Sequence, residues 1–499
     1  MDISLTNVHL GGVALLLAVG IFIIKSLRSP LNKIPGPWHT QWTGLVSRYH
    51  SWKGHLPPYI HSLHEAYGPI IRTGPKAVYI ADPAAYHQMT SVKNEFLKEP
   101  QFYWALHPGI SNVFTTVRID VHRHFRRLLA AGVSDSGLRA FHKQIEPKPR
   151  AAIAGMQAEM ETRGAADVAK WWHLMTLDVI SELAFGETAG LLQRGEKDEF
   201  ARDLEALGRA ASIRVVLPEL TWYLMPRFPI PPKSAENARR LRQHASEALR
   251  RHQRLTENTP EGEVRPTLFS KLYKARDEDA LSFENLRDNA QVYMTAGTGT
   301  TATSLTFLVW SVCRREDVQR RLVAEVQGRV AALAAAAGGG GGEDFGYEDI
   351  KDLPYLNCVI NETLRLFSVV AAGMPRVVPS GGATLVGQFV PAGTTVLAQS
   401  YTLHRNGRVF PRPEEFLPER WENPSKEMKD SIIVFGGGSR VCIGQHLAMM
   451  QMRLATCRFF HAFPEAKVSQ REGMSDADMD ASFYVLLSPK GRRCLIEAC

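Results

Sequence analysis

The spacing of apolar residues predicts a chain that is mostly helical. Over long stretches, apolar side chains recur every three or four residues, as on the buried face of an α-helix. Strand-like runs bounded by glycine and proline occur near residues 69–81 and 376–397. The pattern therefore predicts a fold that is mainly α with small β-sheets.

One long helix is predicted from Phe283 to Arg314, because Ser282 is a good N-cap and the second half of the segment is largely apolar. Its middle, residues 296–302, reads Ala-Gly-Thr-Gly-Thr-Thr-Ala. Each glycine there weakens the helix by about 1 kcal/mol relative to alanine, so we expect a local widening that admits a ligand. The string also resembles a dinucleotide-binding fingerprint, but that motif must follow a strand and open a helix. This string lies inside a helix, so nucleotide binding is not expected.

The N-terminal segment is predicted to be a membrane anchor. Residues 8–24 are almost entirely apolar, and seventeen residues lie at the short end of the roughly 17–25 that span a bilayer. Lys25, Arg28 and Lys33 follow, which places the N-terminus in the lumen and the rest of the chain in the cytosol. A cleaved signal peptide is the alternative, but it would need a basic start and a small-residue cleavage site. The chain has Lys25-Ser26-Leu27-Arg28 there instead, which favours the anchor.

Three regions are predicted: an anchor over residues 1–29, a proline-rich hinge over 30–40 and one catalytic domain over 41–499. Proline removes a backbone donor and restricts the residue before it, so Pro30 and the Ile-Pro-Gly-Pro segment should stop the helix and form a stiff connection. No long polar linker or internal repeat divides the rest of the chain. With 44% hydrophobic residues, that part can bury a large core.

Two further segments stand out from the helical pattern. Ala331–Gly342 is an alanine tract that runs into glycines, and we expect a flexible surface insertion there. Val215–Pro232 combines aromatic residues with several prolines. It is either a second membrane-touching loop or an ordinary buried connection.

Charge and cysteine content narrow the class of protein. The net charge of +8 permits an anionic membrane surface, nucleic acid or an acidic protein as partner. The chain has no basic run with interleaved aromatic residues, the pattern typical of nucleic-acid binding. Nucleic acid is therefore not expected as a partner. The six cysteines are scattered without metal-finger spacing, which suits a reducing cytosol.

One of those cysteines lies in a glycine-rich loop directly before a predicted helix. Residues 435–444 read Phe-Gly-Gly-Gly-Ser-Arg-Val-Cys-Ile-Gly, and residues 445–460 have helical spacing. The helix start should stabilise a thiolate at Cys442 and lower its pKa. The glycines let the backbone approach a flat ligand. A structural cysteine beside a tight turn is the usual alternative for a single cysteine, but the surrounding pattern favours a ligand to haem iron.

This loop, Phe-x-x-Gly-x-Arg-x-Cys-x-Gly, resembles the signature of the cytochrome P450 family at every fixed position. Glu362-Thr363-Leu364-Arg365 is similar to the family's E-x-x-R motif, and Pro418-Glu419-Arg420-Trp421 is similar to its P-E-R segment. Glu362 and Arg365 are three residues apart on one helix face, where they can pair and reach Arg420. The resemblance implies a cytochrome P450 fold, here with an N-terminal single-pass transmembrane helix.

The resemblance also implies haem b as cofactor, with Cys442 as the axial metal ligand. Guanidinium groups suit the two haem propionates because they donate two parallel bonds to a carboxylate. The family commonly has tryptophan where this chain has His122. The cofactor-binding residues that the resemblance implies are Cys442, Arg126, Arg376, Arg440, His122, Phe435, Gly444 and Gly297.

Thr300 is the one residue predicted to be catalytic. Members of the family carry [Ala/Gly]-Gly-x-[Asp/Glu]-Thr in the long helix, where the hydroxyl and the acid help to protonate iron-bound dioxygen. This chain keeps Thr300 but has Gly299 in the acid position. Thr298, Thr301 and ordered water could substitute for the acid, or the enzyme could run chemistry that needs fewer protons.

The substrate pocket implied by the resemblance is apolar. Its walls come from residues 102–114, 295–300, 369–373 and 482–485, which are chiefly apolar and aromatic. Such walls suit a lipophilic small molecule held by few polar anchors. The predicted function is the oxidation of such a molecule, a secondary metabolite, by a monomer in the endoplasmic reticulum membrane.

Electrons are expected from NADPH through NADPH-cytochrome P450 reductase, an acidic partner that Arg123, Arg127 and Arg453 could dock. Two alternatives stay open. A haem-thiolate isomerase or dehydratase would act without a reductase, and Gly299 keeps that possibility. A haem carrier or sensor is disfavoured, because Thr300 and an apolar pocket would then have no purpose.

Overall fold

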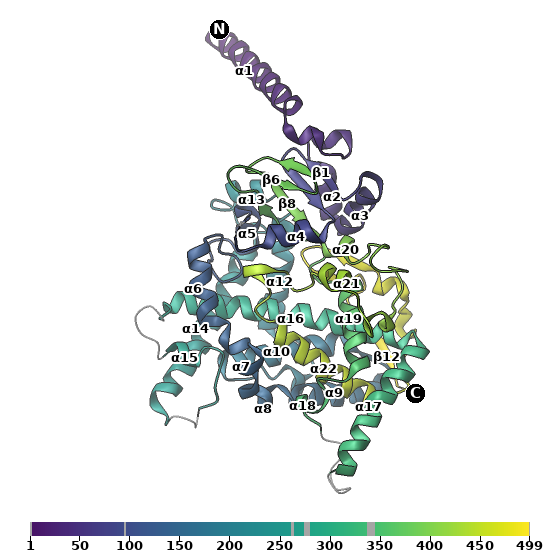
Figure 1. Cartoon of the computed structure of the whole chain (residues 1–499). Coiled ribbons are helices and arrows are strands. Elements are labelled where there is room, and N and C mark those ends of the chain that lie inside the picture. Colours follow the sequence, from purple (N-terminus) through teal and green to yellow (C-terminus); the bar gives the residue numbers. More distant parts are fainter. Residues whose placement is uncertain (1, 94–95, 261–263, 274–279, 337–344, 499) are drawn as a thin grey trace.

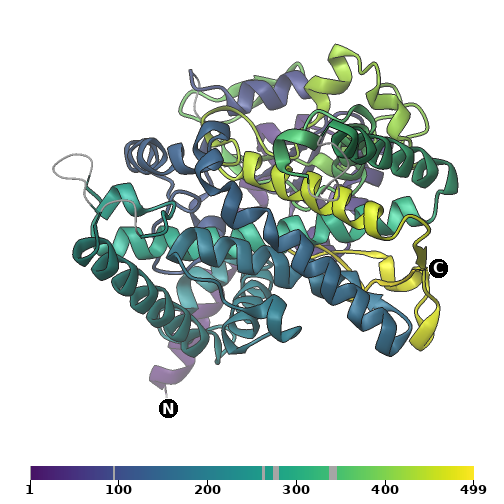
Figure 2. The same cartoon turned by 90° about the horizontal axis from the view of Figure 1, so that it is seen from below.

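The computed structural model describes residues 2–93, 96–260, 264–273, 280–336 and 345–498, and within these ranges the chain is mainly helical, as predicted (Figure 1). Viewed from below, helices dominate the body and short C-terminal strands lie at one edge (Figure 2). The α-helices are α1 (Asp2–Leu27), α2 (Leu45–Trp52), α3 (Leu56–Tyr67), α4 (Pro83–Thr90), α5 (Pro100–Leu106), α6 (Ile119–Leu129), α7 (Asp135–Leu138), α8 (His142–Ile145), α9 (Pro147–Arg163), α10 (Val168–Phe185), α11 (Leu191–Arg194), α12 (Glu199–Arg214), α13 (Pro218–Leu224), α14 (Ser234–Asn258), α15 (Ser270–Tyr273), α16 (Phe283–Cys313), α17 (Glu316–Ala336), α18 (Tyr347–Ile350), α19 (Pro354–Leu366), α20 (Ser400–Leu403), α21 (Lys426–Ser431) and α22 (Gln445–Ala462).

The sheets are small. β1 (Ile70–Gly74), β2 (Ala77–Ile80), β3 (Leu97–Lys98), β5 (Arg376–Val377) and β8 (Thr395–Ala398) form the largest, in the order β1-β2-β8-β5-β3. β4 (Ala166–Asp167), β9 (Lys467–Val468) and β12 (Leu495–Glu497) form a second. Two hairpins complete the set: β6 (Ala383–Leu385) with β7 (Gln388–Val390), and β10 (Ala481–Phe483) with β11 (Leu487–Pro489). The predicted strand regions 69–81 and 376–397 are confirmed.

The core is built around α16, which packs along α10 and also contacts α22 and α19. The predicted long helix is confirmed: the Ser282 hydroxyl caps it by accepting the Asn285 N–H at 3.1 Å. α10 is buried almost from end to end, and Thr176 Oγ1 donates to the Thr298 carbonyl of α16 at 3.1 Å. This pair of helices forms the rigid centre on which the site is built.

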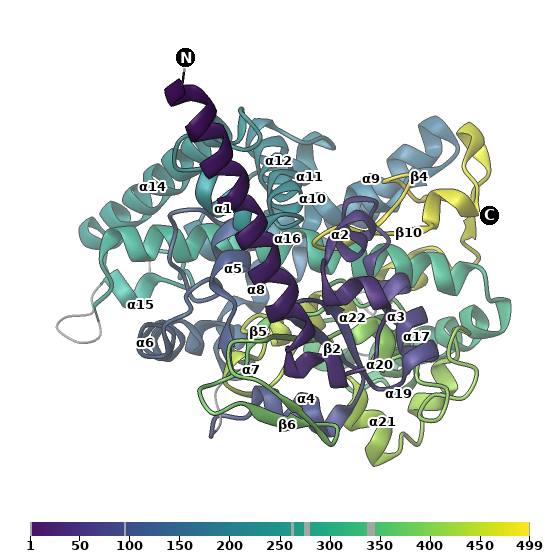
Figure 3. The ribbon, with the colours of Figure 1, turned by 90° about the horizontal axis from the view of Figure 1, so that it is seen from above.

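Helix α1 projects from the body, and Figure 3 shows it from above in front of the other elements (Figures 1 and 3). From Val13 onward its apolar side chains are largely exposed, with Leu16 73% accessible. Nevertheless, among the described residues no helix is both long and apolar enough to cross a membrane. The transmembrane span predicted within residues 1–29 is therefore not supported.

Residues 30–40, predicted to be a hinge, are packed against the body. Leu31 and Ile34 are 3% and 2% exposed. The buried guanidinium of Arg72 in β1 donates to Thr40 Oγ1 at 3.1 Å and to Asn32 Oδ1 at 2.5 Å. The segment is thus held to the first strand by hydrogen bonds and apolar contacts.

The two other unusual segments contain helices. Residues 331–336 continue α17, because alanine is the best helix former, and the rest of the predicted insertion lies outside the described residues. Within Val215–Pro232, α13 exposes Tyr223, and Phe228 beyond it is also exposed (71% and 64%). That segment is therefore not an ordinary buried connection.

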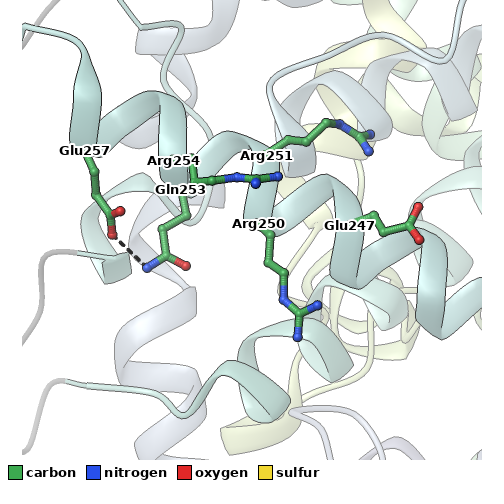
Figure 4. A pocket seen from close by; sticks show the side chains of 6 residues that line it. All are labelled: Glu247, Arg250, Arg251, Gln253, Arg254 and Glu257. Carbon is green, nitrogen blue, oxygen red and sulfur yellow. Dashed lines mark hydrogen bonds between the residues drawn. The ribbon is translucent and has the colours of Figure 1, made fainter.

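A shallow hollow also lies on α14 (Figure 4). Its six described lining side chains are charged or amide groups of that single helix: Glu247, Arg250, Arg251, Gln253, Arg254 and Glu257. Such a lining does not suit an apolar ligand.

Candidate active site

The cysteine loop is a tight turn that ends at the start of α22. The Cys442 N–H donates to the Phe435 carbonyl at 2.7 Å, which closes the loop. Gly438 has φ +61, and a Cβ there would lie 1.8 Å from the Thr90 carbonyl oxygen, so only glycine fits. Gly444 caps α22, which places Cys442 just before the helix as predicted.

Cys442 faces space inside the protein. Its side chain is exposed, yet the surrounding protein shields it from bulk water. Burial raises the pKa of the thiol, while the Gly444 N–H and Arg126 lower it by less. The prediction of a lowered pKa is therefore wrong for the protein alone, because desolvation of the thiolate outweighs the helix start. A bound cation would supply the missing compensation.

The middle of α16 is the second open surface in the core. Ala296 is exposed and Thr300 half-buried, although most neighbouring α16 residues are buried. The Thr300 hydroxyl donates to the Ala296 carbonyl at 2.7 Å. A flat ligand between Ala296 and Cys442 would need accessible surface at both residues. Both are accessible although they lie within the helical core.

The other threonines of α16 are buried away from this surface. Thr298 is 1% exposed, and its hydroxyl donates to the Met294 carbonyl at 2.7 Å. Thr301 is 3% exposed. A Cβ at Gly299 would meet nothing within 4 Å, so this position has room for a side chain. Thr300 is therefore the accessible threonine of this stretch.

Gly297 has a packing role. A Cβ there would lie 3.2 Å from Ile180 of α10, so glycine allows the two helices to approach closely. Phe435 is partly buried and packs against the main core. The haem contacts assigned to Gly297, Phe435 and Gly444 stay predictions.

Basic side chains from four segments converge beside the cysteine loop. Arg126 of α6 donates to the Val441 carbonyl at 2.6 Å, and Arg440 donates to the Thr116 carbonyl at 3.2 Å. His122 is buried, and burial followed by Arg440, Lys98, Arg126 and Arg376 lowers its pKa to about 3. All the charged neighbours that shift the pKa of His122 are cations. The cluster thus brings together Arg126, Arg376, Arg440 and His122, whose roles toward haem stay predictions.

Lys98 is a member of this cluster that sequence reasoning missed. It is 4% exposed in β3 and pairs across the sheet with Arg376 of β5. Its ammonium lies 4.5 Å from the centre of the Tyr103 ring and donates to the Phe114 carbonyl. Burial, then Arg440 and Arg376, hold its pKa well below the usual value.

This cluster fits the carboxylates of haem. Burying several like charges without a counter-ion is costly, and two carboxylates would offset much of that cost. No motif surrounds Lys98 in the sequence, because only the β3–β5 pairing brings it to Arg376.

A buried ion-pair network joins α19 to the segment of Arg420 and Trp421. Glu362 and Arg365 of α19 are fully buried and form two hydrogen bonds of 2.8 Å. Glu362 also accepts from Arg420 Nε at 3.0 Å and from Trp421 Nε1 at 2.9 Å. The pairing of Glu362, Arg365 and Arg420 predicted from spacing is confirmed.

His404 connects this network to the loop. Its Nδ1 contacts the Arg365 carbonyl at 3.0 Å, and its Nε2 accepts the Ile433 N–H at 3.1 Å, two residues before Phe435. Burial lowers the pKa of His404 to about 3, so the ring is neutral with its proton on Nδ1. The position of the cysteine loop therefore depends on α19.

Two of the predicted pocket walls, 102–114 and 482–485, pack in one cluster, and the pocket itself stays a prediction. Tyr103 and Leu106 of α5 pack with Ala211 of α12, and with Phe114, Met374 and Val485 at the edge of that cluster. The Val113 N–H donates to Asn289 Oδ1 of α16 at 2.8 Å, which ties one wall to that helix. α12 contributes a wall that the sequence-based prediction did not include.

Comparisons with known proteins agree with this geometry. A family model of cytochrome P450 matches residues 34–495. The cytochrome P450 monooxygenase orf2 of Aspergillus niger is 37% identical over 493 residues, covering 98% of this chain and 97% of the relative. The cytochrome P450 monooxygenase tazI of Aspergillus terreus is 38% identical, covering 97% of each chain, and stcB of Emericella nidulans is 32% identical, covering 96% and 91%. The chain therefore belongs to the cytochrome P450 family, oxidoreductases that carry haem on a cysteine thiolate.

Proposed function

We propose that this protein is a haem-thiolate monooxygenase that hydroxylates, epoxidises or desaturates a lipophilic secondary metabolite, using dioxygen and NADPH electrons from a reductase. The observation that carries this proposal is the accessibility of Cys442 and, on α16, of Ala296 and Thr300, within a core whose helices are largely buried. Relatives named as monooxygenases support the reaction class. Apolar walls support the class of substrate.

The chain's residues divide the work of holding the haem. Cys442 would supply the sulfur ligand, and bound haem would supply the oxygen-activating chemistry. Four cations beside the cysteine loop would hold its carboxylates, buried Lys98 and partly buried Arg126, Arg376 and Arg440, with neutral His122 beside them. The proposal is tested by screening lipophilic metabolites for spin-state shifts and then assaying the hits with NADPH and reductase.

Thr300 is the proposed proton-handling residue. Its hydroxyl already donates to the Ala296 carbonyl, so its lone pairs stay available to accept a hydrogen bond from water in the cavity. No carboxylate stands at position 299 to exchange that proton with solvent. Water or a substrate hydroxyl must therefore complete the relay.

Thr300→Ala should uncouple NADPH consumption from product formation. General acid catalysis contributes about 10²–10⁴-fold, and we expect roughly a tenfold loss of product with matching peroxide release, because water keeps part of the relay. The measurement compares product, peroxide and NADPH in the presence of reductase. Unchanged coupling in Thr300→Ala would rule out the hydroxyl relay.

Gly299→Asp is the matched variant. The open space at this position accepts the side chain, and aspartate costs no more helix propensity than glycine. Improved coupling would show that proton supply limits the wild-type enzyme.

The alternative function is a haem-thiolate isomerase or dehydratase that rearranges a peroxide substrate. Gly299 favours it, because such chemistry needs no carboxylate to deliver protons. Product that forms without NADPH or reductase would establish this alternative over the monooxygenase.

The reductase is proposed to dock near the cysteine loop. Arg123 and Arg127 are exposed on α6, whereas Arg453 donates to the Tyr347 hydroxyl at 2.8 Å. A hollow of about 410 Å³ beside the loop is lined by Phe435, Gln445 and Arg453, among others. The exposed cations of α6 suit an acidic partner.

We also propose that α1 holds the protein on the endoplasmic reticulum membrane, with residues 31–499 in the cytosol. The exposed apolar face of α1 and the aromatic residues exposed around α13 support this attachment. Removing residues 1–27 should shift the protein from the microsomal pellet toward the supernatant. Protease added to intact microsomes should digest the catalytic domain, and protection until detergent is added would overturn this orientation.

A further inference from the structure

Arg214, at the end of α12, is a buried cation bonded to backbone carbonyls of other segments. It is 1% exposed, and its side chain makes no ion pair in the part of the chain that the structure describes. Its Nε donates to the Ala105 carbonyl at 2.7 Å and its Nη2 to the Leu106 carbonyl at 3.0 Å. Its Nη1 lies 3.4 Å from the Ile230 carbonyl. One side chain thus joins α12, α5 and the segment beyond α13.

The two carbonyls that Arg214 binds lie at the end of α5, where they have no hydrogen-bond partner inside the helix. The last four carbonyls of a helix have no partner inside it, and α5 ends at Leu106. Both Ala105 and Leu106 are buried, so water cannot replace Arg214 without entering the structure. The partial negative charge at the end of α5 also stabilises the guanidinium.

Other contacts extend the same connection to α13. Thr221, 4% exposed, donates its hydroxyl to the Arg214 carbonyl at 3.0 Å. The Trp104 and Trp222 rings lie 5.0 Å apart, centre to centre, and join α5 to α13 directly. α5, α13 and the end of α12 therefore form one fastened unit, which we call the α5–α13 cover.

This cover lies beside the ligand space. Tyr103 and Leu106 of α5 share a cluster with Val485, which belongs to the predicted substrate pocket, and with Met374 directly after another predicted wall. Tyr103 is also close enough to Arg376 and Arg440 for their charges to affect its ionisation. The short helix that Arg214 fastens therefore carries side chains that border the cation cluster and the predicted pocket.

We propose that Arg214 is a positioning residue that keeps the α5–α13 cover closed over the pocket, so that breaking its bonds to α5 limits how fast ligands enter and leave. The inference rests on the proposed haem site, because the pocket is defined by it. Arg214 does not touch the substrate; it acts through α5. Opening exposes two carbonyls and a guanidinium, and closing restores their hydrogen bonds.

The test measures ligand exchange on the ferric holoenzyme. 4-Phenylimidazole binds haem iron and shifts the Soret band, so stopped-flow mixing gives its association and dissociation rates without turnover or reductase. Arg214→Met keeps most of the side-chain volume but removes the donors. Because hydrogen bonds to a charged group are strong, losing them should make opening easier, and we expect the association and dissociation rates each to rise by about tenfold or more. The ratio of the two rates should change little.

Two further variants make the result specific. Arg214→Lys keeps the charge but cannot donate to both α5 carbonyls, so its rates should lie between those of wild type and Arg214→Met. Arg209→Met, on the same helix with its side chain 54% exposed, should match wild type. Wild-type rates in a haem-loaded Arg214→Met or Arg214→Lys protein would overturn the proposal, even if the oxidation reaction is as proposed.

Hydrogen exchange on the wild-type holoenzyme tests the cover without a variant. Amides of α5 and α13 should exchange together, as one opening unit, and both should slow when 4-phenylimidazole is bound. Independent exchange of the two helices would contradict a shared fastening by Arg214.

Discussion

Cys442→Ala should abolish the absorption band that the ferrous carbon monoxide complex of a thiolate-ligated haem gives, and should remove most bound haem. Cys442 combines an open side chain with a position at the glycine-rich turn. Because burial raises the pKa of this thiol, the thiolate depends on the bound iron, and the iron depends on the thiolate. Removing the sulfur therefore removes the bond through which the thiolate and the iron stabilise one another.

Matched cysteine variants test this assignment. Cys457 of α22 is fully buried and Cys358 of α19 is 5% exposed, so neither faces the cavity. Cys457→Ala and Cys358→Ala should keep the band. A Cys442→Ala protein that keeps the band, while one of the other two loses it, would show that the axial ligand is misassigned.

Glu362→Gln should destabilise the folded protein more than any surface substitution. Its fully buried carboxylate accepts from fully buried Arg365 and from the partly buried Arg420, Trp421 and Leu417 N–H. Breaking a buried pair by removing one charge typically costs about 3–5 kcal/mol, because the partner stays buried and uncompensated. Since the Arg365 carbonyl holds His404 beneath the cysteine loop, haem retention should fall together with the free energy of unfolding.

The control is Glu414→Gln. Glu414 pairs with Arg405 at 3.0 Å, but its side chain is 64% exposed. Exposed pairs contribute about 0–1 kcal/mol, so this variant should retain haem and stability. Urea unfolding followed at the Soret band measures both variants. Equal stability of Glu362→Gln and Glu414→Gln would mean that the buried network does not support the loop.

The sequence by itself determined the features that depend on neighbours along the chain. The cysteine loop and the helix after it, the helix from Phe283 and the pairing of Glu362 with Arg365 all follow from local spacing, because backbone geometry fixes which residues share a turn or a helix face. The predicted start of the flexible insertion at Ala331 was wrong for a local reason too, since the alanines that precede the glycines continue α17.

Tertiary structure decided what depends on burial and on segments far apart in the chain. Lys98 meets Arg376 only through a strand pairing, and Arg214 reaches the carbonyls of α5 across more than a hundred residues. The pKa of Cys442 depends on how much protein surrounds it, which reversed the direction expected from the helix start. No motif encodes these contacts, because desolvation and long-range pairing are set by the packed fold rather than by spacing along the chain.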